Sequence, residues 1–133
     1  MPDSKKRLLF IDDERDVCEV LKTKFQIFGF EVFVAHDGKE GFEKASKIKP
    51  HCIILDIRMP REDGLTFLRR LRAYRSDDLD LETEIRKIPV LVLTAAGDQM
   101  QPLFHLEGIS DYVEKPFDSE DLRNRILKVI VPV

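Results

Sequence analysis

The chain has 133 residues, of which 43% are apolar and 35% charged, and these proportions are typical of one globular domain. No apolar run approaches the roughly 20 residues of a membrane-spanning helix. Because Met1 to Arg7 also lacks the apolar segment of a signal peptide, we expect a cytosolic protein. The formal net charge of -3 argues against nucleic-acid binding as the main function. The two cysteines, Cys18 and Cys52, fit reduced, buried thiols better than a disulfide or a metal site.

Short apolar runs alternate with helical patterns along the chain. The runs predict five buried strands, at Arg7–Asp12, Glu31–Ala35, Cys52–Asp56, Pro89–Thr94 and Asp111–Val113. Apolar residues spaced three and four apart predict helices at Asp16–Phe28, Gly38–Ile48, Gly64–Arg72, Leu103–Leu106 and after an N-cap at Asp118. This alternation indicates an α/β domain, in which right-handed crossovers join a parallel sheet covered by helices on both faces.

Polar side chains gather where the predicted strands end. The first strand ends in Asp12-Asp13, the third in Asp56 and the fourth in Thr94, and Lys115 follows the fifth. In the strand order 2-1-3-4-5 these ends are neighbours, and open α/β sheets bind ligands beyond this edge. Carboxylates brought together there need a cation, and oxygen ligands without His or Cys favour Mg²⁺. With an ammonium and a hydroxyl alongside, the predicted chemistry is phosphoryl transfer to a carboxylate.

These residues resemble the receiver domain of two-component response regulators, from about Lys6 to Ile130. The motifs that carry the resemblance are Asp12-Asp13, Asp56-Ile57-Arg58-Met59-Pro60 running on to Asp63-Gly64, Thr94-Ala95, and Tyr112 before Lys115-Pro116-Phe117. The resemblance implies a single receiver domain over residues 1–133. Its fold would be the flavodoxin-like (βα)5 fold, a doubly wound parallel sheet of five strands in the order 2-1-3-4-5 with helices on both faces.

The resemblance also implies a phosphoacceptor and a metal site. Asp56 would accept a phosphoryl group from a phosphohistidine on a sensor histidine kinase or phosphotransfer protein. Asp13, Asp56 and the backbone carbonyl of Arg58 would hold Mg²⁺, and Asp12 would contribute through water.

A switch is implied by the same resemblance. Lys115 would pair with the phosphate, Thr94 would move to bond it, and Tyr112 would swing inward behind Thr94 as the readout. The Lys115-Pro116 bond would be cis. The last strand and the last two helices would present an output face to an output domain or a downstream protein, with no direct nucleic-acid binding and no membrane contact.

One segment departs from the family pattern, and the histidines show no pattern that indicates a function. The interval from Asp56 to Thr94 is 38 residues, longer than receivers usually have, with the surplus in Ser76–Lys87. Apolar residues among the acids of this segment fit either a helical extension or a mobile loop, and the sequence leaves the choice open. The three histidines show no partner spacing, and we assign them to the surface: His36, His51 and His105.

The alternative function is that of a Mg²⁺-dependent phosphatase acting on a small substrate through an aspartyl phosphate. Such phosphatases place a further Asp two residues after the nucleophile as general acid, whereas Arg58 stands there in this chain. They also need a cap or pocket for the substrate, for which 133 residues leave no room. The sequence therefore favours a signalling switch that is not an enzyme beyond its own phosphoryl transfer and dephosphorylation.

Overall fold

The computed structural model of the chain describes residues 5–56, 61–95 and 108–130, except for the side chains of residues 61–63 and 95. Within these ranges, five parallel strands form one sheet in the order β2-β1-β3-β4-β5. The strands are β1 (Arg7–Ile11), β2 (Glu31–Ala35), β3 (Cys52–Asp56), β4 (Val90–Ala95) and β5 (Asp111–Lys115). The predicted flavodoxin-like strand order is thereby confirmed.

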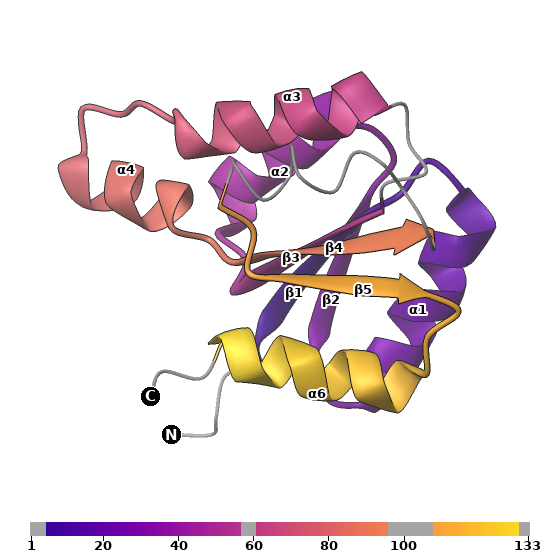
Figure 1. Ribbon diagram of the computed structural model, residues 1–133. Helices are drawn as coiled ribbons and strands as arrows, with labels where there is room; N and C mark the ends of the chain where they lie inside the picture. Colours follow the sequence, from indigo (N-terminus) through magenta and orange to yellow (C-terminus); the bar gives the residue numbers. More distant parts are fainter. Residues whose placement is uncertain (1–4, 57–60, 96–107, 131–133) are drawn as a thin grey trace.

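Helices cover both faces of the sheet (Figure 1). On one face lie α2 (Gly38–Ile48) and α3 (Arg61–Arg72), and on the other α1 (Arg15–Ile27) and α6 (Ser119–Ile130). Asp37 caps α2 by accepting a hydrogen bond from the amide of Glu40 at 2.7 Å. Gly29 follows α1 with a φ of +103°, a conformation that glycine adopts without strain. The helix predicted at 103–106 lies outside the described residues.

The strands are buried because their side chains alternate between two apolar layers. In β1, Leu9 and Ile11 pack under α2 and α3, whereas Leu8 and Phe10 pack against α1 and α6. All four side chains are at most 1% exposed, which explains why this strand reads as an unbroken apolar run. Both cysteines are buried and free, as the sequence predicts. None of the helices in the described ranges is long and apolar enough to cross a membrane.

An additional helix, α4 (Leu79–Arg86), lies between α3 and β4 in the chain. Figure 1 shows it at the end of the sheet opposite to the arrowheads of the strands. Asp78 caps it by accepting a hydrogen bond from the amide of Asp80 at 3.0 Å. Ile85 is fully buried in the apolar layer under α3. The segment Ser76–Lys87, whose state the sequence leaves open, therefore contains a docked helix.

Arg72, the last residue of α3, holds α4 against the domain. Its guanidinium donates to the carbonyl oxygens of Arg86 at 2.8 Å, Ile88 at 2.9 Å and Gly108 at 3.1 Å. In return, Nε of Arg86 donates to the carbonyl oxygen of Tyr74 at 2.7 Å. These bonds tie the C-terminal end of α4 to the packed domain, remote from the carboxyl ends of the strands.

Each outer strand of the sheet has a carbonyl covered by a cation from the helix that follows it. Lys44 of α2 donates to the carbonyl oxygen of Val34 in β2 at 2.5 Å. Arg125 of α6 donates to the carbonyl oxygen of Tyr112 in β5 at 3.3 Å. Arg125 also pairs with Asp111 at 3.1 Å, which fixes its guanidinium beside the strand.

Candidate functional site

Asp56 and Lys115 meet at the carboxyl ends of β3 and β5. Asp56 is 1% exposed, and its Oδ2 lies 2.5 Å from Nζ of Lys115. The Lys115-Pro116 bond is cis, as the family resemblance predicts. A hollow of about 250 Å³ adjoins the pair and is lined also by Val17, Leu21, Leu93, Pro116 and Phe117. A buried carboxylate with one ammonium partner beside such an opening is suited to attack an incoming electrophile.

The turn that follows β1 is acidic. Carboxylate oxygens of Asp12, Asp13 and Glu14 lie within 4.8 Å of one another. Asp12 is 2% exposed, and its Oδ1 accepts a hydrogen bond from the amide of Glu14 at 3.0 Å. Carboxylates this close repel one another and favour a bound cation, and their oxygen atoms suit Mg²⁺. Glu14 was not among the predicted ligands, although its place in a run of three acids was a visible signal.

Asp56 is not a member of this group of three, but its negative charge affects the thiol of Cys18, as does the charge of Asp12. Burial above all raises the pKa of the Cys18 thiol to about 11, and the negative charges of Asp12 and Asp56 add to that effect. Sγ of Cys18 contacts the carbonyl oxygen of Asp12 at 3.4 Å, and Ile11 pairs with Leu55, so Asp12 and Asp56 occupy neighbouring positions at the ends of β1 and β3. Arg58, whose backbone carbonyl was a predicted metal ligand, lies outside the described residues.

The predicted switch residues, Thr94 and Tyr112, share one face of the sheet. Thr94 is 2% exposed near the end of β4, and Tyr112 is half-buried in β5 against the layer under α3. Tyr112 pairs in register with Val92, two residues before Thr94, so the two side chains are diagonal neighbours. By the same alternation Asp56 lies on the side of Ile54, which packs toward α1 and α6.

Two of the histidines predicted to lie at the surface are only partly exposed, and each makes a specific contact. His36 is half-buried, with Nδ1 3.1 Å from the carbonyl oxygen of Asp12. His51 is also half-buried, and its Nδ1 accepts a hydrogen bond from the amide of Arg7 at 2.9 Å. Each contact joins two strands that are distant in the sequence, so no local spacing indicated it. His105 lies outside the described residues.

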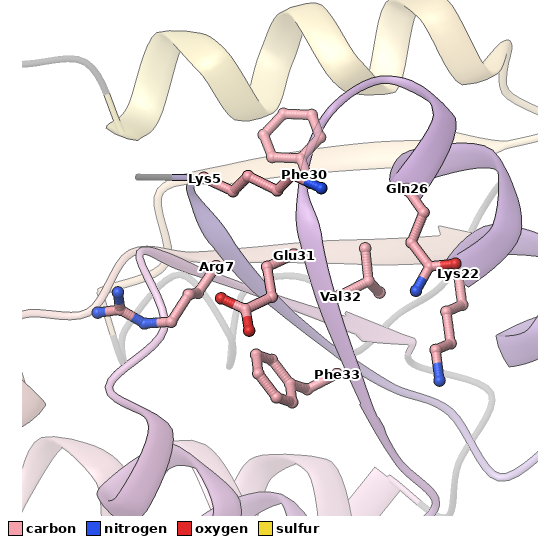
Figure 2. A pocket seen from close by; sticks show the side chains of 8 residues that line it. All are labelled: Lys5, Arg7, Lys22, Gln26, Phe30, Glu31, Val32 and Phe33. Carbon is pink, nitrogen blue, oxygen red and sulfur yellow. The ribbon is translucent and has the colours of Figure 1, made fainter. Parts of the chain in front are cut away.

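A larger hollow, of about 770 Å³, lies along β2 near the amino ends of the strands (Figure 2). Its lining consists of Lys5, Arg7, Lys22, Gln26, Phe30, Glu31, Val32 and Phe33. Figure 2 shows Lys22 and Gln26, which come from α1, on one side of the strand and Arg7 on the other. None of the predicted site residues borders this hollow, so it is separate from the acidic end of the sheet.

Sequence comparison finds several relatives of this chain. A family model described as the response regulator receiver domain matches residues 8–127. The response regulator MprA of Mycobacterium ulcerans (strain Agy99) is 39% identical over 121 residues, which are 90% of this chain and 48% of that protein. The probable transcriptional regulator ycf27 of Cyanophora paradoxa is 35% identical over 128 residues, which are 96% of this chain and 49% of that protein. The chain spans about half the length of these curated relatives.

Solved structures show the same fold. A response regulator signal receiver domain from Bermanella marisrubri superposes with a TM-score of 0.81 at 28% identity, covering 96% of this chain and 100% of that chain. A response regulator receiver domain protein from Clostridium thermocellum superposes with a TM-score of 0.76 at 27% identity, covering 94% of each chain. Together with the strand order, these matches show that the chain belongs to the response regulator receiver domain family, the signalling domains of two-component systems.

Proposed function

We propose that this domain accepts a phosphoryl group on Asp56 and changes conformation in response. The phosphodonor is a phosphohistidine on a sensor histidine kinase or a phosphotransfer protein. The observation that carries the proposal is the contact of 2.5 Å between the buried Asp56 carboxylate and Lys115, next to the acidic turn. Membership of the receiver family supports it independently.

The transfer itself requires only one nucleophile from this chain. A carboxylate oxygen of Asp56 attacks phosphorus, the bond between phosphorus and the donor imidazole nitrogen breaks, and its electron pair stays on the imidazole. Such a transfer depends mainly on in-line positioning and on neutralisation of charge. The ammonium of Lys115 pairs with the free carboxylate before the transfer and with the phosphoryl oxygens after it. The hydroxyl of Thr94 donates a hydrogen bond to one of these oxygens.

The acidic turn fits the metal that the family implies. Asp13, Asp56 and the carbonyl of Arg58 would hold Mg²⁺, Asp12 would contribute through water, and Glu14 adds a further carboxylate near the site. The donor set is made of oxygen atoms, which this small, hard cation prefers. When bound, Mg²⁺ neutralises charge on the phosphoryl oxygens.

The readout we propose is the diagonal pair Thr94 and Tyr112. When Thr94 turns toward the phosphoryl group, the space that it leaves lies beside Tyr112, whose ring can then move inward. The surface formed by β5, α6 and the helix predicted at 103–106 would carry the change to an output domain or a downstream protein. Residues 1–133 would together form a single receiver domain.

Intact-protein mass spectrometry tests the proposal. With Mg²⁺ and a small phosphodonor such as acetyl phosphate, the wild type should gain the mass of one phosphoryl group, and without Mg²⁺ it should not. Asp56→Asn should gain none, whereas Asp80→Asn, a change on the exposed side of α4, should behave as wild type. Asp13→Ala should need more Mg²⁺ because it removes a metal ligand but leaves the nucleophile.

Undiminished phosphoryl uptake by Asp56→Asn would contradict the assignment of the nucleophile. Uptake by the wild type in the presence of excess chelator would contradict the metal requirement. No observation on the described residues favours the alternative of a phosphatase for small substrates.

A further inference from the structure

We infer that His36 is a positioning residue for the Mg²⁺ site, and that it acts through the backbone carbonyl of Asp12. The inference rests on the proposed function, because it concerns the turn that would hold the metal in that reaction. It adds to this site the side chain that follows β2, a strand for which the sequence predicted no site residue.

Two side chains converge on the carbonyl oxygen of Asp12. Nδ1 of His36 lies 3.1 Å from it, and Sγ of Cys18 donates to it at 3.4 Å. The imidazole nitrogen and the sulfur are themselves 3.7 Å apart. A carbonyl oxygen can only accept, so the imidazole contact is a hydrogen bond when Nδ1 carries the proton. The geometry therefore selects the Nδ1-protonated form of His36.

His36 is itself held by α2. Its backbone amide donates to Oε1 of Glu40 at 2.8 Å, and the other carboxylate oxygen of Glu40 pairs with Lys44 at 3.0 Å. The hydrogen bond from this amide is the main reason that the pKa of Glu40 lies below its usual range, so the acceptor stays ionised. The imidazole thus projects from a backbone position that is anchored on the helix.

The residue next to His36 completes the hold on Asp12. The amide of Asp12 donates to the carbonyl oxygen of Ala35 at 3.0 Å, while its carbonyl oxygen faces His36. Both polar backbone groups of Asp12 are therefore engaged by consecutive residues at the end of β2.

This hold matters for metal binding because of where the Asp12 carbonyl lies. The carbonyl belongs to the peptide unit that leads into Asp13, so its direction sets where the Asp13 carboxylate points. Without the donor from His36, the weaker bond from the Cys18 thiol remains on this carbonyl, so the peptide unit is less firmly held and the carboxylates are less well ordered for Mg²⁺. Groups that hold metal ligands in place typically change metal affinity by about 10-fold to 100-fold when they are removed.

The test measures Mg²⁺ affinity in the absence of any phosphodonor, by following amide signals of the apo protein by NMR during titration with Mg²⁺ alone. His36→Leu should weaken binding about 10-fold because it removes the donor. His36→Asn should bind nearly as the wild type, because the amide nitrogen of Asn can take the place of Nδ1. His51→Leu changes the other half-buried histidine, far from the acidic turn, and should leave the affinity unchanged.

A second readout reports the contact itself. Nitrogen chemical shifts of the His36 ring in the apo wild type, recorded at neutral pH, should show the proton on Nδ1. The Nε2-protonated form would overturn the inference even if His36→Leu failed to fold. It would be overturned equally if His36→Leu bound Mg²⁺ as tightly as the wild type, or if His36→Asn bound as weakly as His36→Leu.

These outcomes are distinct from failure of the proposed function. A wild type that binds Mg²⁺ but takes up no phosphoryl group would contradict phosphoryl acceptance, and the affinities of the variants would still decide the role of His36. A wild type that does not bind Mg²⁺ would overturn the inference.

Discussion

Nζ of Lys115 lies 2.5 Å from Oδ2 of Asp56, although 59 positions separate the two residues in the sequence. Lys115 is 22% exposed at its side chain, whereas Asp56 is 1% exposed, so the lysine neutralises a carboxylate that water hardly reaches. An anion arriving at Asp56 competes for the same ammonium. The contact that the Lys115 side chain makes therefore depends on the charge present at Asp56.

We first predict that Lys115→Met destabilises the apo domain by about 1–3 kcal/mol, because it leaves the buried carboxylate of Asp56 without its ammonium. Mg²⁺ should restore part of this loss, since it supplies positive charge near the same carboxylate. Urea unfolding with and without Mg²⁺ measures both effects. The control is Arg125→Met, which breaks a more exposed ion pair with Asp111 and should cost less than about 1 kcal/mol. Equal losses in the two variants would contradict the prediction.

The second prediction concerns Thr94 and Tyr112. A beryllofluoride mimic of the phosphoryl group should reduce the mobility of the Tyr112 ring in the wild type. Thr94 moves toward the mimic, and the ring moves inward into the space that Thr94 leaves, where it is packed more tightly. The mimic should have no such effect in Thr94→Ala, which lacks the hydroxyl that bonds it. NMR of the ring signals in all four samples provides the measurement. Identical ring behaviour with the mimic demonstrably bound would leave Tyr112 as ordinary packing.

Third, α4 contributes to the stability of the domain through one buried side chain. Ile85→Ala should lower the free energy of unfolding by about 2–5 kcal/mol, because Ile85 is fully buried under α3. Leu79→Ala, in the same helix at a side chain that is 71% exposed, should change it by less than about 0.5 kcal/mol. Both are measured by denaturant unfolding. Similar small effects from the two variants would show that α4 is not docked as described.

The fourth prediction is a dependence of stability on pH through His51. Burial first, and then the positive charges of Arg7 and Lys6, lower the pKa of His51, while Glu84 opposes the effect. Protonation of His51 is therefore less favourable in the folded state, where its Nδ1 accepts a hydrogen bond from the amide of Arg7. Stability from this source is complete above the pKa of the unfolded histidine, about 6.5, and falls as the pH drops below it toward the folded pKa.

The variant His51→Asn isolates this effect. Its side-chain oxygen can accept the amide of Arg7 in place of Nδ1, but it does not titrate in this range. Between pH 7.5 and pH 5.5 the wild type should lose more stability in urea unfolding than His51→Asn does. The same loss in both proteins would assign the pH dependence to groups other than His51.

Much of the site could be predicted because its residues stand directly at strand ends. The strand that ends at Asp56 is buried on both faces and is an apolar run in the sequence. The first acidic residue after the run therefore marks its carboxyl end. The same holds for Asp12 and Asp13 after β1. Parallel topology then brings these ends to one edge of the sheet.

Other features depend on contacts that local patterns do not carry. The eight residues of α4 are too few to be stable as an isolated helix, so the helix depends on the burial of Ile85 and on the bonds of Arg72. His36 meets Asp12 because β1 and β2 pair in one register, and neither residue has a sequence spacing that reveals it. Both features follow from tertiary packing.

The cations at the two outer strands limit how copies of this domain can associate. An exposed strand edge is a template on which another chain can add a strand. Lys44 on Val34 and Arg125 on Tyr112 each fill a carbonyl that such a strand would use, and each places a positive charge in its path. The addition of a strand from another molecule is therefore disfavoured at both edges of the sheet.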